Sequence, residues 1–406
     1  MNILFITHYY DPDSGAAANR LTRLAQGLQQ RGHAVTVLTT MPHYPKGVIP
    51  QGYRNRWTVI EDRDGVRVVQ IWLWATTSPK IIWRLLSQIS FMLALMLRGV
   101  FVQQPDVIFI ENQPIFTGFA GWFISKIKRR RYVMNVSDYW PEYLYVSGTV
   151  SQESMVYRVF EWLANLTQRQ AAHIAILWPG LRQGITSRIG NPPPITLIYN
   201  AVDHQQFDNA DDGAFRAKYA LGDKRLVTFL GVLGAHIDLP TMLTTARDLA
   251  AYDVTVLFVG TGTQKDALIA ALEQPEYAHC RRIEWIDQDA VPGFWAASHI
   301  TYWALHDNPL DKMRFQAKLY EALASGTPPV IAVEGLMSDF LAEADAGLTV
   351  PSGDAGALTA ALVRLLEDED AYTALSQRGR DYARTHFDRA QQIDAYEQVL
   401  TAIAHK

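Results

Sequence analysis

The sequence predicts two doubly wound α/β domains that follow one another along the chain. The first 40 residues contain an apolar strand, an amphipathic helix and a second strand, which together form the βαβ unit of a parallel sheet. A similar alternation restarts at residue 225, after a break in composition over residues 191–203 that includes three consecutive prolines. A chain of 406 residues is also too long for one ordinary core.

The elements of the first domain are predicted from apolar patterns. The run 2–7 is continuously apolar, as in a strand buried on both faces of a parallel sheet. The helix 16–30 places Leu21 and Leu28 on one face. It ends before Gly32, a residue type that is common just beyond helix ends. Further strands are predicted at residues 34–40, 67–74, 106–111, 132–138 and 173–178.

The second domain repeats the alternation of strands and helices. One helix is predicted over residues 239–251, and a last helix over 388–404 has apolar residues at helical spacing. We expect residues 1–199 to form the first domain and residues 200–387 the second, while the terminal helix 388–406 could pack back on the first domain. The predicted strands are 225–234, 254–263, 281–286, 300–305 and 328–333.

Composition excludes several classes of protein. A hydrophobic content of 49% with 19% charged residues is typical of a globular chain and not of a disordered or fibrous one. The single cysteine, Cys280, excludes a disulfide framework and a cysteine-based metal site, and it suits a reducing cytoplasm. The apolar start lacks a basic n-region, so we expect no secretory signal. No spacing of histidines and carboxylates indicates a dedicated metal site, and we expect none.

Charge is distributed unevenly between the two halves. Residues 1–200 hold 20 lysines and arginines against 11 aspartates and glutamates, whereas residues 201–406 hold 17 against 30. A basic half joined to an acidic half indicates that one domain meets a polyanion or an anionic membrane. The alternative is a chance segregation of solvated surface charge.

The apolar stretch 81–102 raises the question of a membrane. Its longest charge-free run, 85–97, has 13 residues, fewer than the roughly 20 that a transmembrane helix needs. A buried helix or one at a membrane interface remains. The nearby tract 126–131 has five basic residues, which favours peripheral contact with anionic headgroups over a buried helix beside a solvated loop. Three nearby tryptophans are expected to be core residues: Trp72, Trp74 and Trp83.

Glycine-bearing turns follow two neighbouring predicted strands of the second domain. Gly260 and Gly262 end one strand, and Gly231 and Gly234 end the strand before it. Glycine lets a ligand approach the backbone, and free N–H groups at a helix start favour phosphate. Two such turns would line one crevice at the edge where open α/β sheets bind nucleotides.

A block beyond these turns resembles a known family. Residues 318–331 read KLYEALASGTPPVI, which is similar to the K-x-x-E-x-x-A-x-G-x-P-V-I signature of the retaining GT-B glycosyltransferases of family 4. The resemblance covers nearly the whole chain, because further segments match family motifs in the same order. These are the second strand at 33–38, the linker 200–203 with Phe207, the V-G-x-G segment 258–262, and the segments 346–348 and 351–354.

The first half is similar to bacterial envelope enzymes of the L-fucosamine-transferase type. The matching segments are 41–45, 52–53 and 138–142, which resemble P-x-Y-P, G-Y and D-x-W-P-E. The resemblance implies two Rossmann-like domains facing each other across a cleft. It further implies a nucleotide-sugar donor, UDP-linked by expectation, and a lipid-linked or glycan acceptor in envelope polysaccharide synthesis. The expected place is the cytoplasm, at the inner face of the membrane, with no cofactor, no metal and no nucleic acid.

The resemblance also implies roles for individual residues. Glu321 would hold the ribose hydroxyls, Lys318 would lie near the phosphates, and Asp138 would face the reacting sugar or the acceptor. We expect Asp138 and Glu321 to be the catalytic residues. Further donor contacts are expected at Gly15, Gly234, His236, Gly260, Gly262 and Ile286. Acceptor contacts are expected at His8, Ser14, Trp140 and Glu142, although His8 could equally be a packing residue.

Two departures from the family pattern keep other functions open. The first of the family's paired glutamates is replaced by Met313, and the usual basic pair after Gly231 is absent, with His236 as the nearest substitute. Positive charge for the phosphates could come instead from Lys312, Arg314 or Lys318. The alternatives are a non-catalytic homologue that binds a partner or the membrane, and a nucleotide-sugar epimerase.

Overall fold

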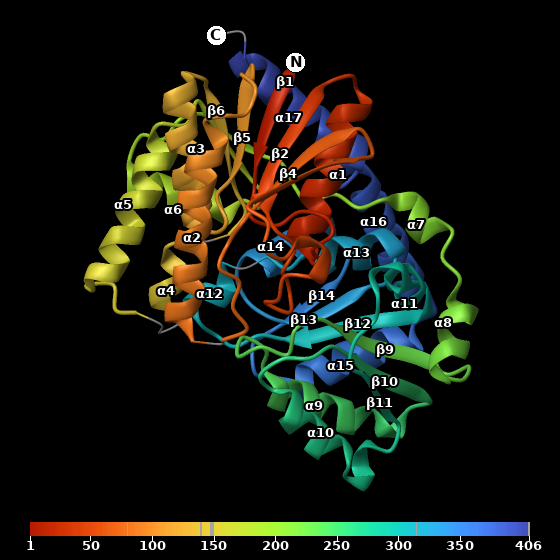
Figure 1. The fold of residues 1–406 in the computed structure, drawn as a ribbon. Helices are drawn as coiled ribbons and strands as arrows, with labels where there is room; N and C mark the ends of the chain where they lie inside the picture. Colours follow the sequence, from red (N-terminus) through yellow and green to blue (C-terminus); the bar gives the residue numbers. More distant parts are fainter. Residues whose placement is uncertain (79, 139, 147–149, 314, 405–406) are drawn as a thin grey trace. The chain divides into compact units, whose positions relative to one another are not determined.

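The chain forms two compact α/β domains in a computed structural model, which describes residues 1–78, 80–138, 140–146, 150–313 and 315–404 (Figure 1). The first domain comprises Met1–Asn200 and Ala390–Lys406, and the second comprises Ala201–Arg389. The first boundary therefore lies one residue beyond the predicted one. The terminal helix α17 (Arg389–Ala404) returns to the first domain from Ala390 on.

The first domain is built on an eight-stranded sheet with the order β3-β4-β2-β1-β5-β6-β7-β8. All neighbouring strands are parallel except β3, which pairs antiparallel with β4. The strands are β1 (Asn2–Ile6), β2 (Ala34–Thr40), β3 (Thr58–Arg63), β4 (Val66–Ile71), β5 (Val107–Glu111), β6 (Tyr132–Val136), β7 (His173–Ile176) and β8 (Ile195–Leu197).

Helices cover both faces of this sheet. Leu21 of α1 and Tyr396 of α17 share a core with Phe5 and Phe109, whose rings stack 4.1 Å apart. The opposite face carries α2, α3 and α5, which neighbour one another in that order (Figure 1). The helices are α1 (Ala16–Gln30), α2 (Ile81–Gly99), α3 (Ile115–Lys128), α4 (Glu142–Val146), α5 (Met155–Arg169) and α6 (Gly180–Ile189), with a short 3-10 turn at Gln51–Tyr53.

The second domain contains a wholly parallel six-stranded sheet with the order β11-β10-β9-β12-β13-β14. Its strands are β9 (Arg225–Leu230), β10 (Val254–Val259), β11 (Cys280–Ile283), β12 (Ser298–Ala304), β13 (Pro329–Ala332) and β14 (Leu348–Val350). Its helices are α7 (His204–Asp208), α8 (Asp212–Tyr219), α9 (Leu239–Asp248), α10 (Lys265–Leu272), α11 (Val291–Ala297), α12 (Pro309–Lys312), α13 (Lys318–Ser325), α14 (Leu336–Ala344), α15 (Ala355–Glu367) and α16 (Glu369–His386).

Several predicted strands are too long at their carboxyl ends. The strand predicted at 225–234 ends at Leu230, because Gly231 starts a turn, and the one predicted at 281–286 ends at Ile283. The short strands β3, β8 and β14 were not predicted. In β3, charged residues interrupt the apolar pattern, and β8 and β14 have only three residues each.

The apolar stretch near residue 81 forms helix α2, which packs on the domain through one face. Phe91 and Leu95 are fully buried, whereas most other residues of the helix are partly or fully exposed. Among the described helices, α2 is the one long and apolar enough to cross a membrane by length and composition. The prediction that the nearby tryptophans belong to the core is wrong for Trp74 and Trp83, which are 42% and 39% exposed. They flank the start of α2, where the chain has left the sheet.

Removing core volume at the end of the chain should destabilise the first domain. Leu400 of α17 is fully buried in the core of that domain. We expect Leu400→Ala to lower the free energy of unfolding by about 2–5 kcal/mol, because it leaves a cavity. Urea denaturation measures the change. The matched control is Gln398→Ala at an exposed position of the same helix, expected within about 0.5 kcal/mol. Equal effects would show that α17 does not complete this core.

Candidate active site

Two glycine turns at the carboxyl edge of the second sheet pack directly against each other. The N–H of Gly231 donates to Val259 O, and the N–H of Leu233 donates to Thr261 O, each at 3.0 Å. A Cβ atom at Gly260 would lie 1.9 Å from Gly231 O, and one at Gly262 would lie 2.4 Å from Leu233 O. The turn after β9 therefore occupies the space left open by these two glycines, which we had expected a ligand to use.

Lys318 points at this pair of turns from the start of α13. Its Nζ lies 4.2 Å from the ring centroid of Phe229 and 4.1 Å from that of Trp303. A Cβ atom at Gly231 would lie 3.5 Å from the same Nζ. Desolvation lowers the pKa of Lys318 well below its usual value. The ammonium thus lies on aromatic faces next to the first turn, and the side chain remains partly exposed.

The other two candidate cations are less suitable for binding a phosphate. Lys312 forms ion pairs with Asp307 at 2.7 Å and Glu334 at 2.9 Å. Arg314 lies outside the described residues. Within the part of the chain that the structure describes, Lys318 has no hydrogen bond and no ion pair to a carboxylate. Lys318 therefore differs from Lys312 in having no carboxylate that would compete with a ligand.

Glu321 lies one turn further along α13, on the same side as Lys318. Its Oε2 accepts a hydrogen bond of 3.0 Å from Nε1 of Trp295, a buried residue of α11. Desolvation raises the pKa of Glu321 to about 7, and the bond from Trp295 opposes this shift only in part. The carboxyl group is thus oriented by an indole N–H, and its second oxygen can accept from a ligand hydroxyl.

The remaining predicted donor residues have different environments. The backbone oxygen of Gly234 accepts from Gln264 Nε2 at 2.7 Å, and a Cβ atom there would lie 2.9 Å from Nδ1 of His236. Ile286 lies beyond the end of β11, and its side chain is buried in the core of the second domain. Only its main chain could therefore contact a base. Gly15 belongs to the first domain and has a φ of 134°, a value that favours glycine.

In the first domain, His8 lies in an aromatic cluster at the end of β1. Its ring centroid is 4.7 Å from Tyr9, 5.1 Å from Phe91 and 5.5 Å from His43. Desolvation, followed by the charge of His43, lowers the pKa of His8 well below its usual value. The ring is therefore neutral, and its burial to 2% exposure agrees better with packing than with acceptor contact. Ser14, in the next loop, is exposed.

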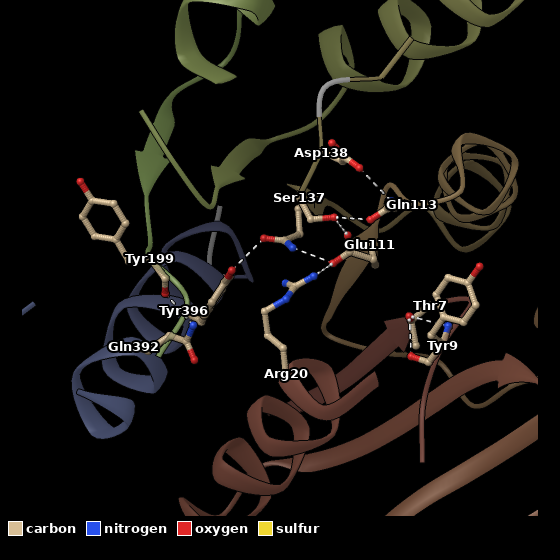
Figure 2. Close-up of polar contacts among 11 residues, drawn as sticks. Thr7, Tyr9, Arg20, Glu111, Gln113, Ser137, Asp138, Tyr199, Gln392 and Tyr396 are labelled. Carbon is tan, nitrogen blue, oxygen red and sulfur yellow. Dashed lines mark hydrogen bonds and ion pairs between the residues drawn. The ribbon is translucent and has the colours of Figure 1, made fainter. Parts of the chain in front are cut away.

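The D-x-W-P-E segment divides into a polar and a structural part. Asp138 follows β6, and its Oδ2 accepts from Gln113 Nε2 at 3.1 Å (Figure 2). Trp140 packs near Phe160 of α5, with ring centroids 6.3 Å apart. Glu142 is buried, and its carboxylate binds the guanidinium of Arg188. Because this carboxylate is already held in an internal ion pair, it is a poor candidate for binding the sugar acceptor.

Sequence reasoning missed the groups that support the predicted residues. Phe229, Trp303 and Trp295 hold Lys318 and Glu321, yet each lies in an apolar run and carries no signal of its own. Glu111, which ends the apolar run of β5, could have been noticed as a carboxylate at a buried strand end. In the described residues, no group of three or more histidine, cysteine, aspartate or glutamate side chains gathers in a way that could hold a metal ion.

The raised pKa of Glu321 predicts a pH-dependent stability. Between its ordinary pKa of 4.5 and about 7, the folded state binds more protons than the unfolded state, so stability falls as pH rises through this window. Glu321→Gln should therefore raise Tm at pH 8 by about 2–4 °C and leave it nearly unchanged at pH 5. Calorimetry measures this, with Glu343→Gln at an exposed position as control. A pH-independent difference would contradict the assigned desolvation.

Comparison with known proteins identifies the class of this chain. Residues 15–201 match the family model described as a glycosyl transferase 4-like domain, and residues 211–382 match the model for glycosyl transferases group 1. A GDP-mannose-dependent alpha-mannosyltransferase of Mycobacterium tuberculosis is 23% identical over 391 residues, which cover 93% of this chain and 91% of the relative.

Solved structures agree with this assignment at the level of the fold. Sucrose-phosphate synthase from Thermosynechococcus elongatus is similar with a TM-score of 0.74 and 18% identity, over 99% of both chains. Anabaena HepE in complex with UDP-glucose is similar with a TM-score of 0.73 and 18% identity, over 99% of this chain and 100% of that one. The two family models, matched in order on two α/β domains with parallel sheets, show that the chain is a glycosyltransferase with the GT-B fold.

Proposed function

We propose that this enzyme is a retaining transferase of family 4 that moves a sugar from a nucleoside diphosphate to a lipid-linked or glycan acceptor in envelope polysaccharide synthesis. The observation that carries the donor assignment is the ammonium of Lys318, which faces the glycine turns without an acidic partner among the described residues. A diphosphate would supply the missing negative charge. Charge-assisted hydrogen bonds of this kind are about twice as strong as neutral ones.

Other residues at the same edge of the sheet would also contact the nucleotide-sugar donor. Glu321, oriented by Trp295, would accept hydrogen bonds from the ribose hydroxyls. The main chain near Ile286 would contact the base, and the backbone near Gly234 would approach the diphosphate or the sugar. UDP is our first candidate, since HepE was solved with UDP-glucose, although one relative is named for GDP-mannose. A panel of donors distinguishes the two bases.

Transfer with retention would pass through an oxocarbenium-like state. The enzyme's task is then to stabilise the departing diphosphate and to orient the acceptor hydroxyl. We assign the first task to Lys318 and to the backbone near Gly234. Asp138 would act on the acceptor or the reacting sugar. Because the protein supplies the positive charge, the proposal needs no metal ion.

A non-catalytic role is the second candidate, because Met313 and Val232 stand where the family has a glutamate and a basic residue. Lys318 bears on this alternative. A desolvated cation has an unfavourable free energy unless an anion pairs with it. That arrangement supports a bound diphosphate even without the usual basic pair, and it therefore favours the enzyme over the scaffold.

We propose that the first domain docks peripherally on the anionic inner face of the membrane. Helices α2 and α5, which flank α3, expose large apolar side chains. Basic residues at the end of α3 and just after it are also exposed, but Lys128 is not among them, since its Nζ donates to the carbonyls of Val100 and Val102. The exposed apolar side chains are Ile81, Ile82, Trp83, Leu86, Leu93, Leu97, Met155, Val156, Val159 and Trp162.

Loss of the Lys318 charge should weaken donor binding. We expect Lys318→Met to reduce UDP affinity about 10- to 100-fold, the loss of a charged hydrogen bond in a desolvated site. Isothermal titration with UDP and GDP measures this. Lys312→Met is the matched control. Lys312 is already paired with two carboxylates, so this substitution should leave the affinity for UDP unchanged.

Three results would overturn the proposal in different ways. Unchanged UDP affinity in Lys318→Met removes the diphosphate site from Lys318. A parent enzyme that binds no nucleoside diphosphate sugar supports the non-catalytic homologue. A parent enzyme that isomerises the donor without releasing nucleoside diphosphate supports an epimerase.

If the first domain docks on the membrane, replacing exposed apolar residues of α2 by polar ones should reduce vesicle binding. We expect the double variant Leu93→Ser and Leu97→Ser to bind phosphatidylcholine–phosphatidylglycerol vesicles at least about 10-fold more weakly, because each leucine contributes about 1.5–3 kcal/mol on burial. Co-sedimentation of the intact enzyme measures this. The control is Val232→Ser, which changes an exposed valine of the second domain. Equal binding to vesicles of phosphatidylcholine alone would remove the electrostatic part of the proposal.

A further inference from the structure

A buried carboxylate organises the carboxyl edge of the first sheet. Glu111, the last residue of β5, is 1% exposed. It accepts hydrogen bonds from Arg20 Nη2 at 3.0 Å and from Asn135 Nδ2 at 2.7 Å, and a third from the Ser137 hydroxyl (Figure 2). An ion pair this deeply buried is stable only when such additional hydrogen bonds satisfy its oxygens.

The far side of this network is closed by the terminal helix. The hydroxyl of Tyr396 in α17 donates to Asn135 Oδ1 at 2.8 Å. This bond fixes the orientation of the Asn135 amide, so that its Nδ2 faces Glu111. The buried end of the network thus joins α1, β5, β6 and α17, and none of its members can turn without breaking a bond to another element.

The near side of the network leads to the proposed reaction site. The single proton of the Ser137 hydroxyl is shared between two acceptors, Glu111 Oε1 and Gln113 Oε1, the latter at 3.1 Å. The Gln113 amide then presents its Nε2 to Asp138 Oδ2, also at 3.1 Å. Exposure increases along this path, from the buried Glu111 to the partly exposed Gln113 and Asp138. The buried end of the path lies inside the domain, and the partly exposed end lies at the carboxyl edge of the sheet.

We infer that Gln113 is a positioning residue for Asp138, and that the buried pair of Arg20 and Glu111 anchors it through Ser137. This inference rests on the proposed role of Asp138 in transfer. An amide N–H directed at one carboxylate oxygen holds the Asp138 side chain in one rotamer and stabilises its charged form. Substrate placement in the reaction depends on such orientation, because misplacement by about 1 Å can cost 10²-fold in rate.

The inference is tested with two substitutions at one position in the full-length enzyme. Gln113→Leu removes the donor, and Gln113→Glu replaces it with a like charge. We expect Gln113→Leu to lower kcat about 10-fold with donor KM nearly unchanged, the pattern of an interaction made in the transition state. In both variants the acidic limb of the pH–rate profile should move to higher pH, and further in Gln113→Glu, because a second carboxylate disfavours the ionised form of Asp138.

A matched control separates positioning from stability. Tyr132→Phe removes another buried hydrogen bond of β6, the one from the Tyr132 hydroxyl to Thr167 O. It should lower Tm without moving the pH profile. Circular dichroism of each variant confirms that the domain is folded before rates are compared.

The outcomes distinguish this inference from the proposed function. If Asp138→Asn transfers sugar at the parent rate, the proposed role of Asp138 is wrong. If Asp138→Asn is inactive while both folded Gln113 variants keep the parent pH profile and kcat, the proposed function stands and the positioning role of Gln113 is overturned. A shifted profile in the Gln113 variants and not in Tyr132→Phe supports it.

Discussion

Apart from β3, the strands of both domains run parallel, so each connection must return across a face of the sheet before the next strand begins. All loops that leave the carboxyl ends of the strands therefore emerge at one edge of each sheet. This constraint brings Arg20 within 3.0 Å of Glu111, although 91 residues separate them in sequence. It also places the turn after β9 against the turn after β10. The chemistry proposed for each domain depends on that edge.

The two edges differ in how their charges are satisfied. In the first domain, the cation of Arg20 and the anion of Glu111 neutralise each other. Hydrogen bonds from Asn135 and Ser137 provide further donors to the carboxylate oxygens. In the second domain, Lys318 has aromatic faces in place of an anion. Cation–π contacts contribute about 0.5–2 kcal/mol each, less than the several kcal/mol that an ion loses on burial. In the proposed function, the diphosphate of the donor would supply the anion that the second edge lacks.

Prediction from sequence succeeded where one residue type determines local structure. Continuous apolar runs located the strands of both sheets except β3, β8 and β14, and Gly32 marked the end of α1. It failed where distant segments decide the environment. No pattern in the sequence states that Gly260 accommodates the backbone of Gly231, or that Phe229 and Trp303 lie under Lys318. The basic tract 126–131 was expected to contact anionic headgroups, yet its Lys128 donates to two carbonyls inside the domain.

The uneven charge of the chain now has a physical interpretation that depends on distance. The net negative half carries the proposed diphosphate site. Its overall charge would oppose diphosphate binding only if the charges of the whole domain acted on the ligand. At physiological salt the Debye length is about 8 Å, so distant surface carboxylates are screened from a phosphate in contact with Lys318. In the proposed docking, by contrast, a membrane surface would meet a whole face of the first domain at once, and each exposed basic residue near it would add about 1 kcal/mol. Under these proposals, net charge would influence where the enzyme docks, and a few local groups would determine what it binds.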